Sequence, residues 1–311
     1  MTGADARARP CPTVVVVGSV NVDLLVSVPR HPEAGETVLG GDAAHSPGGK
    51  GANQAVAAAR LGQRVALVAR VGDDTYGSAL RAGLDAEGVD TAAVRTTMDV
   101  PSGLALITVD GQGENRIVVS PGANAHLTTD DVVASAELLA SAAVTMVQLE
   151  VPHAAVVVAV EQAKGMVMLN PAPAATLPEN VLDRIDVLVP NRVELAVLAG
   201  ESVPATVDEV AELARELPAR AGVVVTLGKD GALVVADGDV AHVPAMPVEV
   251  TDTTGAGDAF CGALADALAR GSALRAAAEW AVRAAGIATT AAGAQTALPT
   301  RALVERSAVS R

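Results

Sequence analysis

The sequence is poor in aromatic residues and in positive charge, and both features bear on its partners. Tyr76, Phe260 and Trp280 are the three aromatic residues among 311, so we expect no stacking platform for single-stranded nucleic acid. The 36 acidic residues outnumber the 22 basic ones, and the net charge of −14 disfavours binding to a nucleic acid backbone. A single nucleotide remains compatible with this charge, because local amides, a metal ion and a helix end act on its phosphates.

Cysteine is equally scarce, and long hydrophobic runs are missing from the sequence. Cys11 and Cys261 stand 250 residues apart with no metal-binding spacing, so we expect no disulfide framework and no zinc site. This usage favours a reducing, cytoplasmic setting. The apolar run at residues 14–17 is too short for a signal-peptide core, and charged residues interrupt every longer run, so no membrane partner is expected.

What is present is an alternation of short β-branched runs and alanine-rich stretches. Residues 13–17 and 64–71 read as strands, while residues 52–61 and 76–87 read as helices, and this rhythm continues to residue 227. Apolar strands joined through helices predict a parallel sheet covered on both faces. Such a sheet binds its ligand at the carboxyl ends of its strands.

Two stretches break this alternation and resemble β-hairpins. One combines residues 23–28 with 36–40, and the other combines residues 102–109 with 115–119. Strands without covering helices predict a small lid sheet over the site. A decorative hairpin at the edge of the main sheet is the alternative interpretation.

The motif Asp252-Thr-Thr-Gly-Ala-Gly-Asp258 directly precedes an expected helix at residues 259–269. Gly255 and Gly257 allow a tight turn that exposes amide hydrogens at the helix start, where an anion is favoured. Asp258 stands beside those amides, placed to take a proton from a hydroxyl nucleophile while the amides stabilise a transferring phosphoryl group. The full seven-residue string favours this function over a structural turn.

The motif Pro47-Gly-Gly-Lys-Gly-Ala-Asn-Gln54 is also followed by an expected helix, at residues 55–61. It is not a phosphate-binding P-loop, because residue 44 is alanine and residue 51 is glycine. Lys50 and Asn53 can instead hydrogen-bond the hydroxyls of a polar substrate. Lys50 is one of three lysines beside 19 arginines, although a glycine-rich loop with an exposed lysine is the simpler interpretation.

Polar residues also follow several expected strands. Asn21-Val-Asp23 follows the first strand and Glu150 follows the run at 144–149, and carboxylates that accept two hydroxyls are a common grip on sugars. Solvated loop acids are the alternative. Asn191-Arg-Val-Glu194 offers an amide and a carboxylate for a hydrated Mg²⁺ or a phosphate, and Thr226-Leu-Gly-Lys-Asp-Gly231 also fits a plain hairpin turn.

Seven motifs follow one another along the chain: Gly18-Ser-Val-Asn-Val-Asp23, Gly48-Gly-Lys-Gly-Ala-Asn-Gln54, Gly113-Glu-Asn115, Gln148-Leu-Glu150, Asn170-Pro-Ala-Pro173, Asn191-Arg-Val-Glu194 and Asp252-Thr-Thr-Gly-Ala-Gly-Asp258. In this order they resemble the PfkB carbohydrate kinase family and, within it, the ribokinases. The resemblance covers residues 13–300. It implies a three-layer α/β/α sandwich with a Rossmann-like central sheet and a small β-sheet lid.

The resemblance further implies one kinase domain over residues 13–311, with lid strands at about 23–46 and 102–119. It implies ATP-dependent phosphorylation of D-ribose at O5, with Mg²⁺ and an activating K⁺, by a homodimer joined through the lid. A related kinase for another sugar or a nucleoside is the first alternative, and a non-catalytic sugar-binding protein is the second. We expect residues 1–12 to be a disordered extension.

The resemblance also implies a role for individual residues. The general base is Asp258, and the anion hole comprises Gly255, Ala256, Gly257 and Asp258. The sugar site comprises Asn21, Val22, Asp23, Gly49, Lys50, Gly51, Ala52, Asn53, Glu150 and Asp258. The ATP site comprises Asn191, Thr226, Leu227, Gly228, Lys229, Asp230, Gly231, Gly257, Asp258 and Val282. Glu194 serves Mg²⁺ indirectly, and the K⁺ site comprises Asp252, Thr254, Ala288, Ala291 and Gly293.

Two departures from the family pattern concern the metal ions. Ala297 stands where ribokinases often carry a serine whose hydroxyl can help the K⁺ site. Arg192 and Val193 replace the more usual acidic residues after Asn191, while Glu194 is kept.

Overall fold

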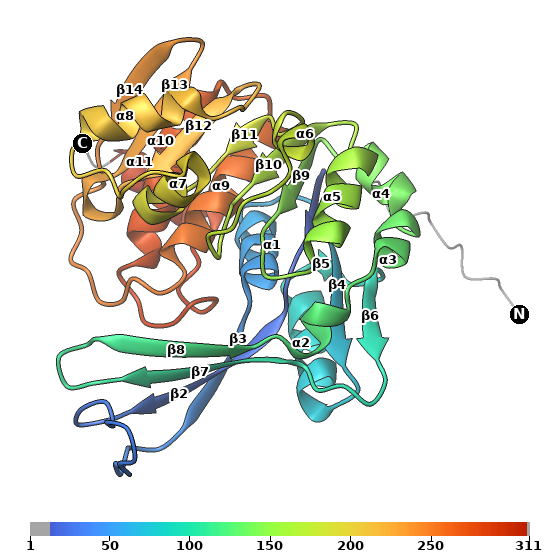
Figure 1. Cartoon of the computed structure of the whole chain (residues 1–311), viewed down its shortest axis with the longest axis vertical. Helices are drawn as coiled ribbons and strands as arrows, with labels where there is room; N and C mark the ends of the chain where they lie inside the picture. The colour runs from blue at the N-terminus through green and yellow to red at the C-terminus, as the bar shows by residue number, and fades with distance from the viewer. Residues whose placement is uncertain (1–12, 310–311) are drawn as a thin grey trace, which may run out of the picture.

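A ten-stranded, mostly parallel sheet forms the centre of the molecule (Figure 1). The computed structural model describes residues 13–309, so the predicted extension at 1–12 lies outside the described residues. The strand order is β14, β13, β12, β11, β10, β9, β1, β4 and β5, with β6 beside β4, and β13 pairs antiparallel with both β12 and β14. Their bounds are β1 Val14–Val17, β4 Val65–Gly72, β5 Val89–Asp90, β6 Val94–Thr97, β9 Val144–Val147, β10 Met166–Leu169, β11 Val187–Leu188, β12 Gly222–Thr226, β13 Ala232–Ala236 and β14 Asp239–Val243.

Helices cover both faces of this sheet, which is why central strands such as β1 are apolar without interruption. Successive side chains of a strand point to opposite faces, and in β1 Val14 and Val16 join one core while Val15 and Val17 join the other. The first core is covered by α1 Lys50–Arg60, α2 Thr75–Ala86, α9 Ala256–Ala269, α10 Leu274–Ala288 and α11 Arg301–Val309. The second is covered by α3 Thr129–Val133, α4 Ala136–Ser141, α5 His153–Gln162, α6 Glu179–Leu182, α7 Arg192–Ala199 and α8 Val207–Glu216. The predicted three-layer α/β/α sandwich is confirmed.

A second sheet of four strands projects from the main body (Figure 1). Its order is β3 Ala44–Gly48, β2 Asn21–Ser27, β7 Gly103–Val109 and β8 Asn115–Ser120. β2 runs parallel to β7 and joins the two antiparallel pairs into one sheet. This sheet is the lid that the sequence predicts.

One predicted lid strand was misplaced. We expected residues 36–40 to pair with the first lid strand, but these residues lie in a loop, and β3 pairs with β2 instead. The register sets Gly48 opposite Asn21, so that β3 leads directly into α1. The loop is braced by an ion pair between Arg30 and Glu36.

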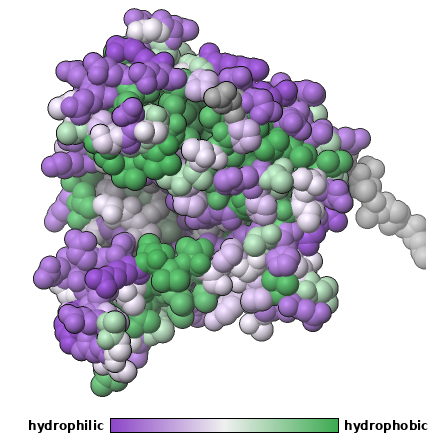
Figure 2. All heavy atoms as spheres, viewed as in Figure 1, coloured by the Kyte–Doolittle hydropathy of each residue, from purple (hydrophilic) through white to green (hydrophobic). Residues whose placement is uncertain are grey.

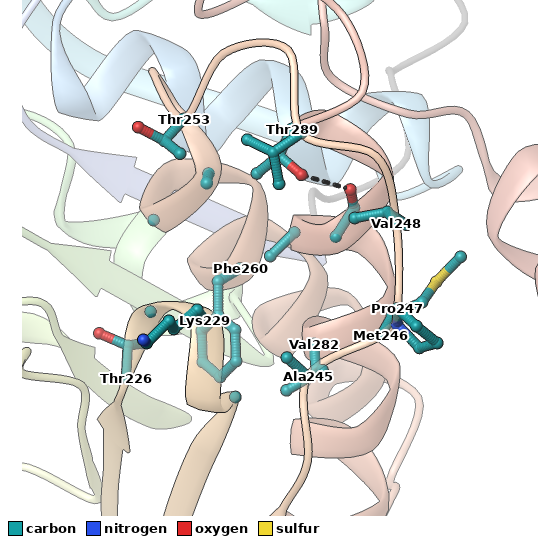
Figure 3. Close-up of a pocket in the computed structure, with 17 residues that line it drawn as sticks. Thr226, Lys229, Ala245, Met246, Pro247, Val248, Thr253, Phe260, Val282 and Thr289 are labelled. Atoms are coloured by element: carbon teal, nitrogen blue, oxygen red, sulfur yellow. Dashed lines mark hydrogen bonds between the residues drawn. The ribbon is translucent and has the colours of Figure 1, made fainter.

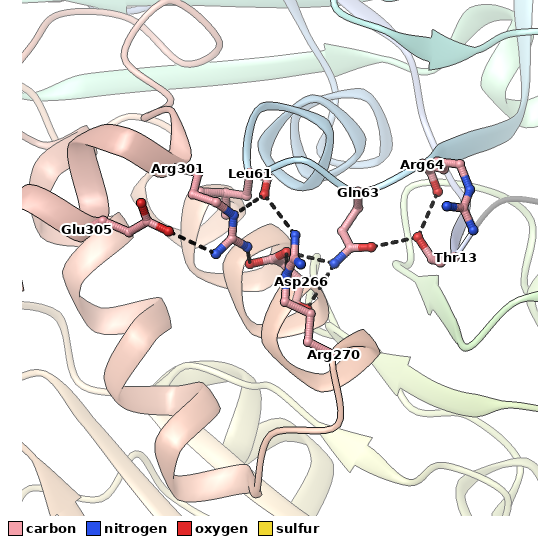
Figure 4. A network of polar contacts seen from close by, with 8 residues as sticks. All are labelled: Thr13, Leu61, Gln63, Arg64, Asp266, Arg270, Arg301 and Glu305. Carbon is pink, nitrogen blue, oxygen red and sulfur yellow. Dashed lines mark hydrogen bonds and ion pairs between the residues drawn. The ribbon is translucent and has the colours of Figure 1, made fainter.

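α1 and α9 cross closely beneath the sheet, and their contact positions the site. A Cβ on Gly262 of α9 would come within 2.4 Å of the Cβ of Ala57 in α1, so only glycine permits this approach. Near the other end of α9, the buried carboxylate of Asp266 binds Gln63, Arg270 and Arg301 (Figure 4). This network ties α9 and α11 to the end of α1.

None of the helices within residues 13–309 is both long and apolar enough to cross a bilayer.

Candidate active site

The carboxyl ends of three neighbouring strands supply one side of the site. Glu150 follows β9, Asn170 follows β10 and Asn191 follows β11. The first turns of α1 and α9 face these ends, because Asn53 and Gln54 of α1 contact Asp258 of α9. The space-filling view shows the molecule hollowed between this region and the lid (Figure 2). The predicted location at the carboxyl edge of the sheet is thus where the motif residues gather.

The glycine turn before α9 has the tight geometry that its sequence predicts. Gly255 caps the helix in the left-handed region at φ 75°, and a Cβ there would come within 2.9 Å of Ala294. Gly255 and Gly257 line a small cavity of about 160 Å³ together with Asp258. The amide of Ala256 donates to the carbonyl of Thr253 at 3.2 Å, so this member of the predicted anion hole has an internal acceptor.

Asp258 is held by two amide side chains. Asn53 Nδ2 donates to Oδ2 at 2.8 Å, and Gln54 Nε2 donates to Oδ1 at 3.0 Å. Burial raises the pKa of Asp258, while the charge of Lys50 and the two amides oppose that rise. A buried carboxylate with a raised pKa that is held in one orientation suits a general base.

The sugar end of the site gathers the predicted carboxylates around Lys50. Glu150 accepts a hydrogen bond from the Lys50 amide at 3.0 Å and another from the hydroxyl of Ser19. Burial opposes the charge of Lys50, but Asp258, Glu150 and Glu194 outweigh it and raise the pKa of Lys50. Lys50 therefore stays charged in the site.

Asp23 lies at the base of the lid, facing the same cluster. A Cβ on Gly48 would lie within 2.3 Å of its carboxylate atoms, so glycine at 48 makes room for that carboxylate. Burial first, and then repulsion from Glu150 and Asp258, raise the pKa of Asp23 to about 6. This carboxylate is poised to accept hydroxyl hydrogens.

Asn53 also carries a free acceptor. Its Oδ1 is buried and has no hydrogen-bond partner among the described residues, although its Nδ2 is bound to Asp258. A buried carbonyl without a donor costs free energy. The arrangement favours a ligand hydroxyl at this position.

A larger cavity of about 640 Å³ opens beside α9 and α10 (Figure 3). Six predicted ATP-site residues line it, namely Thr226, Gly228, Lys229, Gly231, Gly257 and Val282. Of the others, Leu227 is buried in the second core, and the carboxylate of Asp230 lies 4.0 Å from Arg192. Thr226 and Gly257 line both cavities, so the two lie next to each other.

The small cavity lies between the large one and Lys50. Besides the α9 turn, it is lined by Lys50, Asn191 and Glu194. Asn191 caps α7 by accepting from the Glu194 amide, and Glu194 accepts from the Asn191 amide in return. Burial raises the pKa of Glu194, and the Asn191 amide and Lys50 oppose that rise.

Some of the predicted site residues do not place a side chain in the site. Val22 points to the opposite face of β2 from Asn21 and Asp23 and joins the core, as does Ala52. Gly51 lies against Gly18, where a Cβ would meet backbone at 2.6 Å. These positions shape the backbone around the site.

The predicted K⁺ residues lie in two loops that are bound to each other. Asp252 Oδ1 accepts from the Thr254 amide at 2.9 Å, and Oδ2 accepts from the Gly293 amide at 2.8 Å. Ala288 is the last residue of α10, so its backbone carbonyl accepts no hydrogen bond within the helix. Ala291 lies in the loop between Ala288 and Gly293. The side chain of Ala297 is buried.

Sequence reasoning missed two groups of site residues. Ser19, Gln54, Gln148 and Asn170 stand in the quoted motifs and are polar in apolar surroundings, which is a usable signal. The apolar segment at residues 245–250 forms a wall of the large cavity, with Met246 and Val248 among its members (Figure 3). Nothing in its spacing marks it, because any apolar loop would look the same.

Comparison with known proteins places the chain in a family. Residues 12–301 match the profile described as pfkB family carbohydrate kinase. The ribokinase of Bacillus subtilis is 40% identical over 295 residues, covering 94% of this chain and 98% of that protein. The deoxyribokinase of Salmonella typhi is 37% identical, covering 92% and 95%. The structure of Arabidopsis thaliana ribokinase complexed with ribose and ATP superposes with a TM-score of 0.88 at 30% identity, covering 97% of this chain and 100% of that one.

The chain belongs to the pfkB family of carbohydrate kinases.

Proposed function

We propose that this protein is a ribokinase, which transfers the γ-phosphoryl group of ATP to O5 of D-ribose. The observation that carries the proposal is the contact of Asn53 and Gln54 with Asp258, which joins the sugar motif to the base motif. The relatives named ribokinase support the choice of sugar.

The reaction follows from the positions of the side chains. Asp23, Lys50 and Glu150 hold the sugar hydroxyls, and the free carbonyl of Asn53 accepts another. Asp258 takes the proton of the 5-hydroxyl as a bond forms from O5 to the γ-phosphorus. The bond from that phosphorus to the bridging oxygen breaks, and ADP leaves with its electron pair. The amides of the α9 turn and Lys50 stabilise the charge on the transferring group.

The two adjacent cavities suit the two ends of ATP. The apolar wall of the large cavity, with Val282 and Phe260, suits the adenine, and the small cavity beside Lys50 suits the phosphates. The reacting phosphorus then lies near Asp258.

The donor sets suit the two implied metal ions. Glu194 and Asn191 offer oxygens beside the small cavity, where they would hold Mg²⁺ through water, and the ion would neutralise phosphate charge. K⁺ would be held by the Asp252 carboxylate with carbonyls of the loop after α10, all of them hard oxygen donors. Bound there, it would add positive charge next to the α9 turn.

The first experiment measures ADP release from MgATP, in K⁺ buffer, with equal concentrations of D-ribose, 2-deoxyribose, fructose and adenosine. We expect a strong preference for ribose. The Salmonella typhi relative is named deoxyribokinase, so deoxyribose is the first alternative sugar. A preference for deoxyribose would change the proposed substrate and leave Asp258 as the proposed base. Tight ribose binding with no ADP release would favour the non-catalytic reading. Repetition in Na⁺ measures the K⁺ dependence.

Replacement of the base is the sharpest test of the mechanism. Asp258→Asn should lower kcat by about 100- to 10,000-fold, because the variant loses the carboxylate that stands at the glycine turn of α9. The melting temperature and the KM for ATP should stay close to wild type. Near-normal turnover of the folded variant would remove Asp258 from this role.

We further propose that two copies associate through their lids. Leu25, Ile107 and Ile117 are cross-strand neighbours on the lid face that also carries Asp23, and Ile117 is 52% exposed. Apolar side chains gather on the lid beside the hollow (Figure 2). A second copy of this face would cover them. The cytoplasmic location stays a prediction from the sequence.

A further inference from the structure

We infer that Gln54 is a positioning residue that fixes the orientation of the Asp258 carboxylate, an inference that rests on the proposed function. Gln54 lies in the second turn of α1, and its side chain is fully buried, so the sugar meets it only through Asp258. It differs from its neighbour Asn53, whose Oδ1 has no hydrogen-bond partner among the described residues.

Every polar atom of the Gln54 side chain is engaged. Nε2 donates to Asp258 Oδ1 at 3.0 Å and to Asn170 Oδ1 at 3.1 Å. Oε1 accepts from Gln148 Nε2 at 2.6 Å. Asn170 in turn donates to the carbonyl of Val189 at 2.9 Å. A chain of amides therefore runs from the strand ends of the main sheet to the carboxylate.

This chain permits a single orientation of the Gln54 amide. If the amide turned over, its oxygen would face the carboxylate of Asp258 and its nitrogen would face the NH₂ group of Gln148. Both contacts would lose their hydrogen bonds. Asn170, whose Nδ2 is bound to the Val189 carbonyl, presents its Oδ1 to Gln54 and sets the direction of the Gln54 amide. Gln148 supports that direction by donating to Gln54 Oε1, and Gln54 in turn holds Asp258.

The consequence for Asp258 is a carboxylate with a donor on each oxygen. Asn53 holds Oδ2 and Gln54 holds Oδ1, so rotation about the last side-chain bond would break both. The charged groups around Asp258 are Lys50, Glu150, Glu194 and Asp23, and they act on it through space. Orientation is supplied by the two amides, which makes turnover, more than binding, sensitive to Gln54.

The test is a double-mutant cycle on the full-length protein. Gln54→Met has a similar shape and lacks the donors, and it should lower kcat by about 10- to 100-fold, the range for a lost hydrogen bond to a charged group. The KM values for ribose and ATP should change little, because Gln54 contacts neither. Gln148→Met should lower kcat by less. The double variant should be no slower than Gln54→Met, because both act through one contact.

Thr145→Val is the matched control. Thr145 is fully buried in β9, close in sequence to Gln148, and its hydroxyl has no hydrogen-bond partner among the described residues. It should leave kcat unchanged. Thermal melting of each variant reports folding. If Gln54→Met does not fold, the comparison of Gln148→Met with Thr145→Val decides: equal kcat values in the two would overturn the inference.

Failure of the inference and failure of the proposed function are distinguishable. A folded Gln54→Met with wild-type kcat, or additive losses in the double variant, would overturn the positioning role while wild-type ribose turnover stands. A wild type that prefers another sugar would change the proposed substrate, and the cycle would then use that sugar. A wild type inactive on the whole panel would overturn both.

Discussion

At the scale of single residues, the sugar end of the site concentrates negative charge around one lysine. Lys50 is surrounded by Asp258, Glu150 and Glu194, and Asp23 lies close enough to Glu150 and Asp258 to be repelled by both. The hydroxyls of a sugar bound here, as we propose, would relieve this crowding by donating hydrogens to the carboxylates. The same crowding destabilises the sugar-free protein, as is common for functional sites.

This crowding gives Asp23 a pH-dependent effect on stability. Its pKa is about 6 in the folded protein and 3.8 ordinarily, so between these values the folded state holds a proton that the unfolded chain has released. The free energy of unfolding contributed by this group therefore falls as the pH rises through that window. Asp23→Asn should melt at a higher temperature than wild type at pH 7.5, and this difference should shrink towards pH 4.

Thermal melting without sugar, at constant ionic strength, measures this difference. The exposed residue Asp42 provides the control, because Asp42→Asn should shift the melting temperature equally at both ends of the pH range. A difference for Asp23→Asn that is independent of pH would contradict the argument. Asp23→Asn should be more stable than the wild type and should also have a higher KM for ribose.

At the scale of elements, the crossing of α1 and α9 determines whether the site forms. α1 carries Asn53 and Gln54, α9 carries Asp258, and the helices meet at Gly262. A loop turn at the start of α9 places its first-turn amides at the small cavity. The chemistry depends on the distance between two helices that are far apart in the sequence.

Gly262→Ala should disturb this crossing. Its Cβ would lie 2.4 Å from the Cβ of Ala57 and 2.9 Å from the backbone nitrogen of Ala58. We expect a loss of about 1–3 kcal/mol in the free energy of unfolding and a lower kcat, as α1 must move away from Asp258.

Gly83 is the control for that substitution. It lies inside α2, and a Cβ there meets nothing within 4 Å. Gly83→Ala should stabilise the protein by up to about 1 kcal/mol and leave kcat unchanged. Denaturant unfolding and steady-state kinetics measure both effects, and equal behaviour of the two variants would contradict the role of the crossing.

The Asp266 network anchors the other end of α9 (Figure 4). The side chain of Asp266 is 1% exposed and binds Arg301 of α11 and Arg270. Asp266→Ala should lower the free energy of unfolding by about 2–3 kcal/mol, below the range for fully buried pairs because both arginines are partly exposed. The KM for ribose should not change, since Asp258 lies at the opposite end of the helix.

Arg275→Ala serves as the comparison. Arg275 pairs with Glu279 on the surface of α10, with side chains 68% and 42% exposed. Its removal should change the free energy of unfolding by no more than about 0.5 kcal/mol. A loss as large as that of Asp266→Ala would mean that burial does not decide the difference.

At the scale of the whole molecule, the proposed dimer uses one of the two faces of the lid. Neighbouring residues of β8 alternate between them, so Ile117 shares the face of Asp23 while Val118 points the other way. Ile117→Glu should convert a dimer into a monomer and raise the KM for ribose, because the charge cannot be buried between two lids. Val118 is 66% exposed, and the Val118→Glu variant should remain dimeric.

Light scattering after size-exclusion chromatography measures the mass of each variant. A wild type that is monomeric at micromolar concentration would contradict the proposed dimer. Dissociation of Val118→Glu instead of Ile117→Glu would place the interface on the opposite face.

The sequence by itself determined the layered sheet and most of the site motifs. The central strands are largely apolar, and β1 is apolar at every position, a pattern with few structural solutions other than a sheet buried on both faces. The glycine turn before α9 was equally readable, because Gly255 needs a backbone conformation that other residues rarely adopt. The helices predicted at residues 55–61 and 259–269 are both present, and in the structure they begin earlier, at Lys50 and Ala256.

Only the tertiary structure decided which motif residues meet. Gln54 and Asp258 are 204 residues apart in the chain, and nothing local in either motif requires their hydrogen bond. The position of β3 was set by pairing with β2, and the side of Val22 by the alternation along that strand. The cavity wall at 245–250 was equally unreadable, because an apolar loop becomes a binding surface only through the helices that it covers. Contacts between distant segments depend on the packing of whole elements, which no short stretch of sequence encodes.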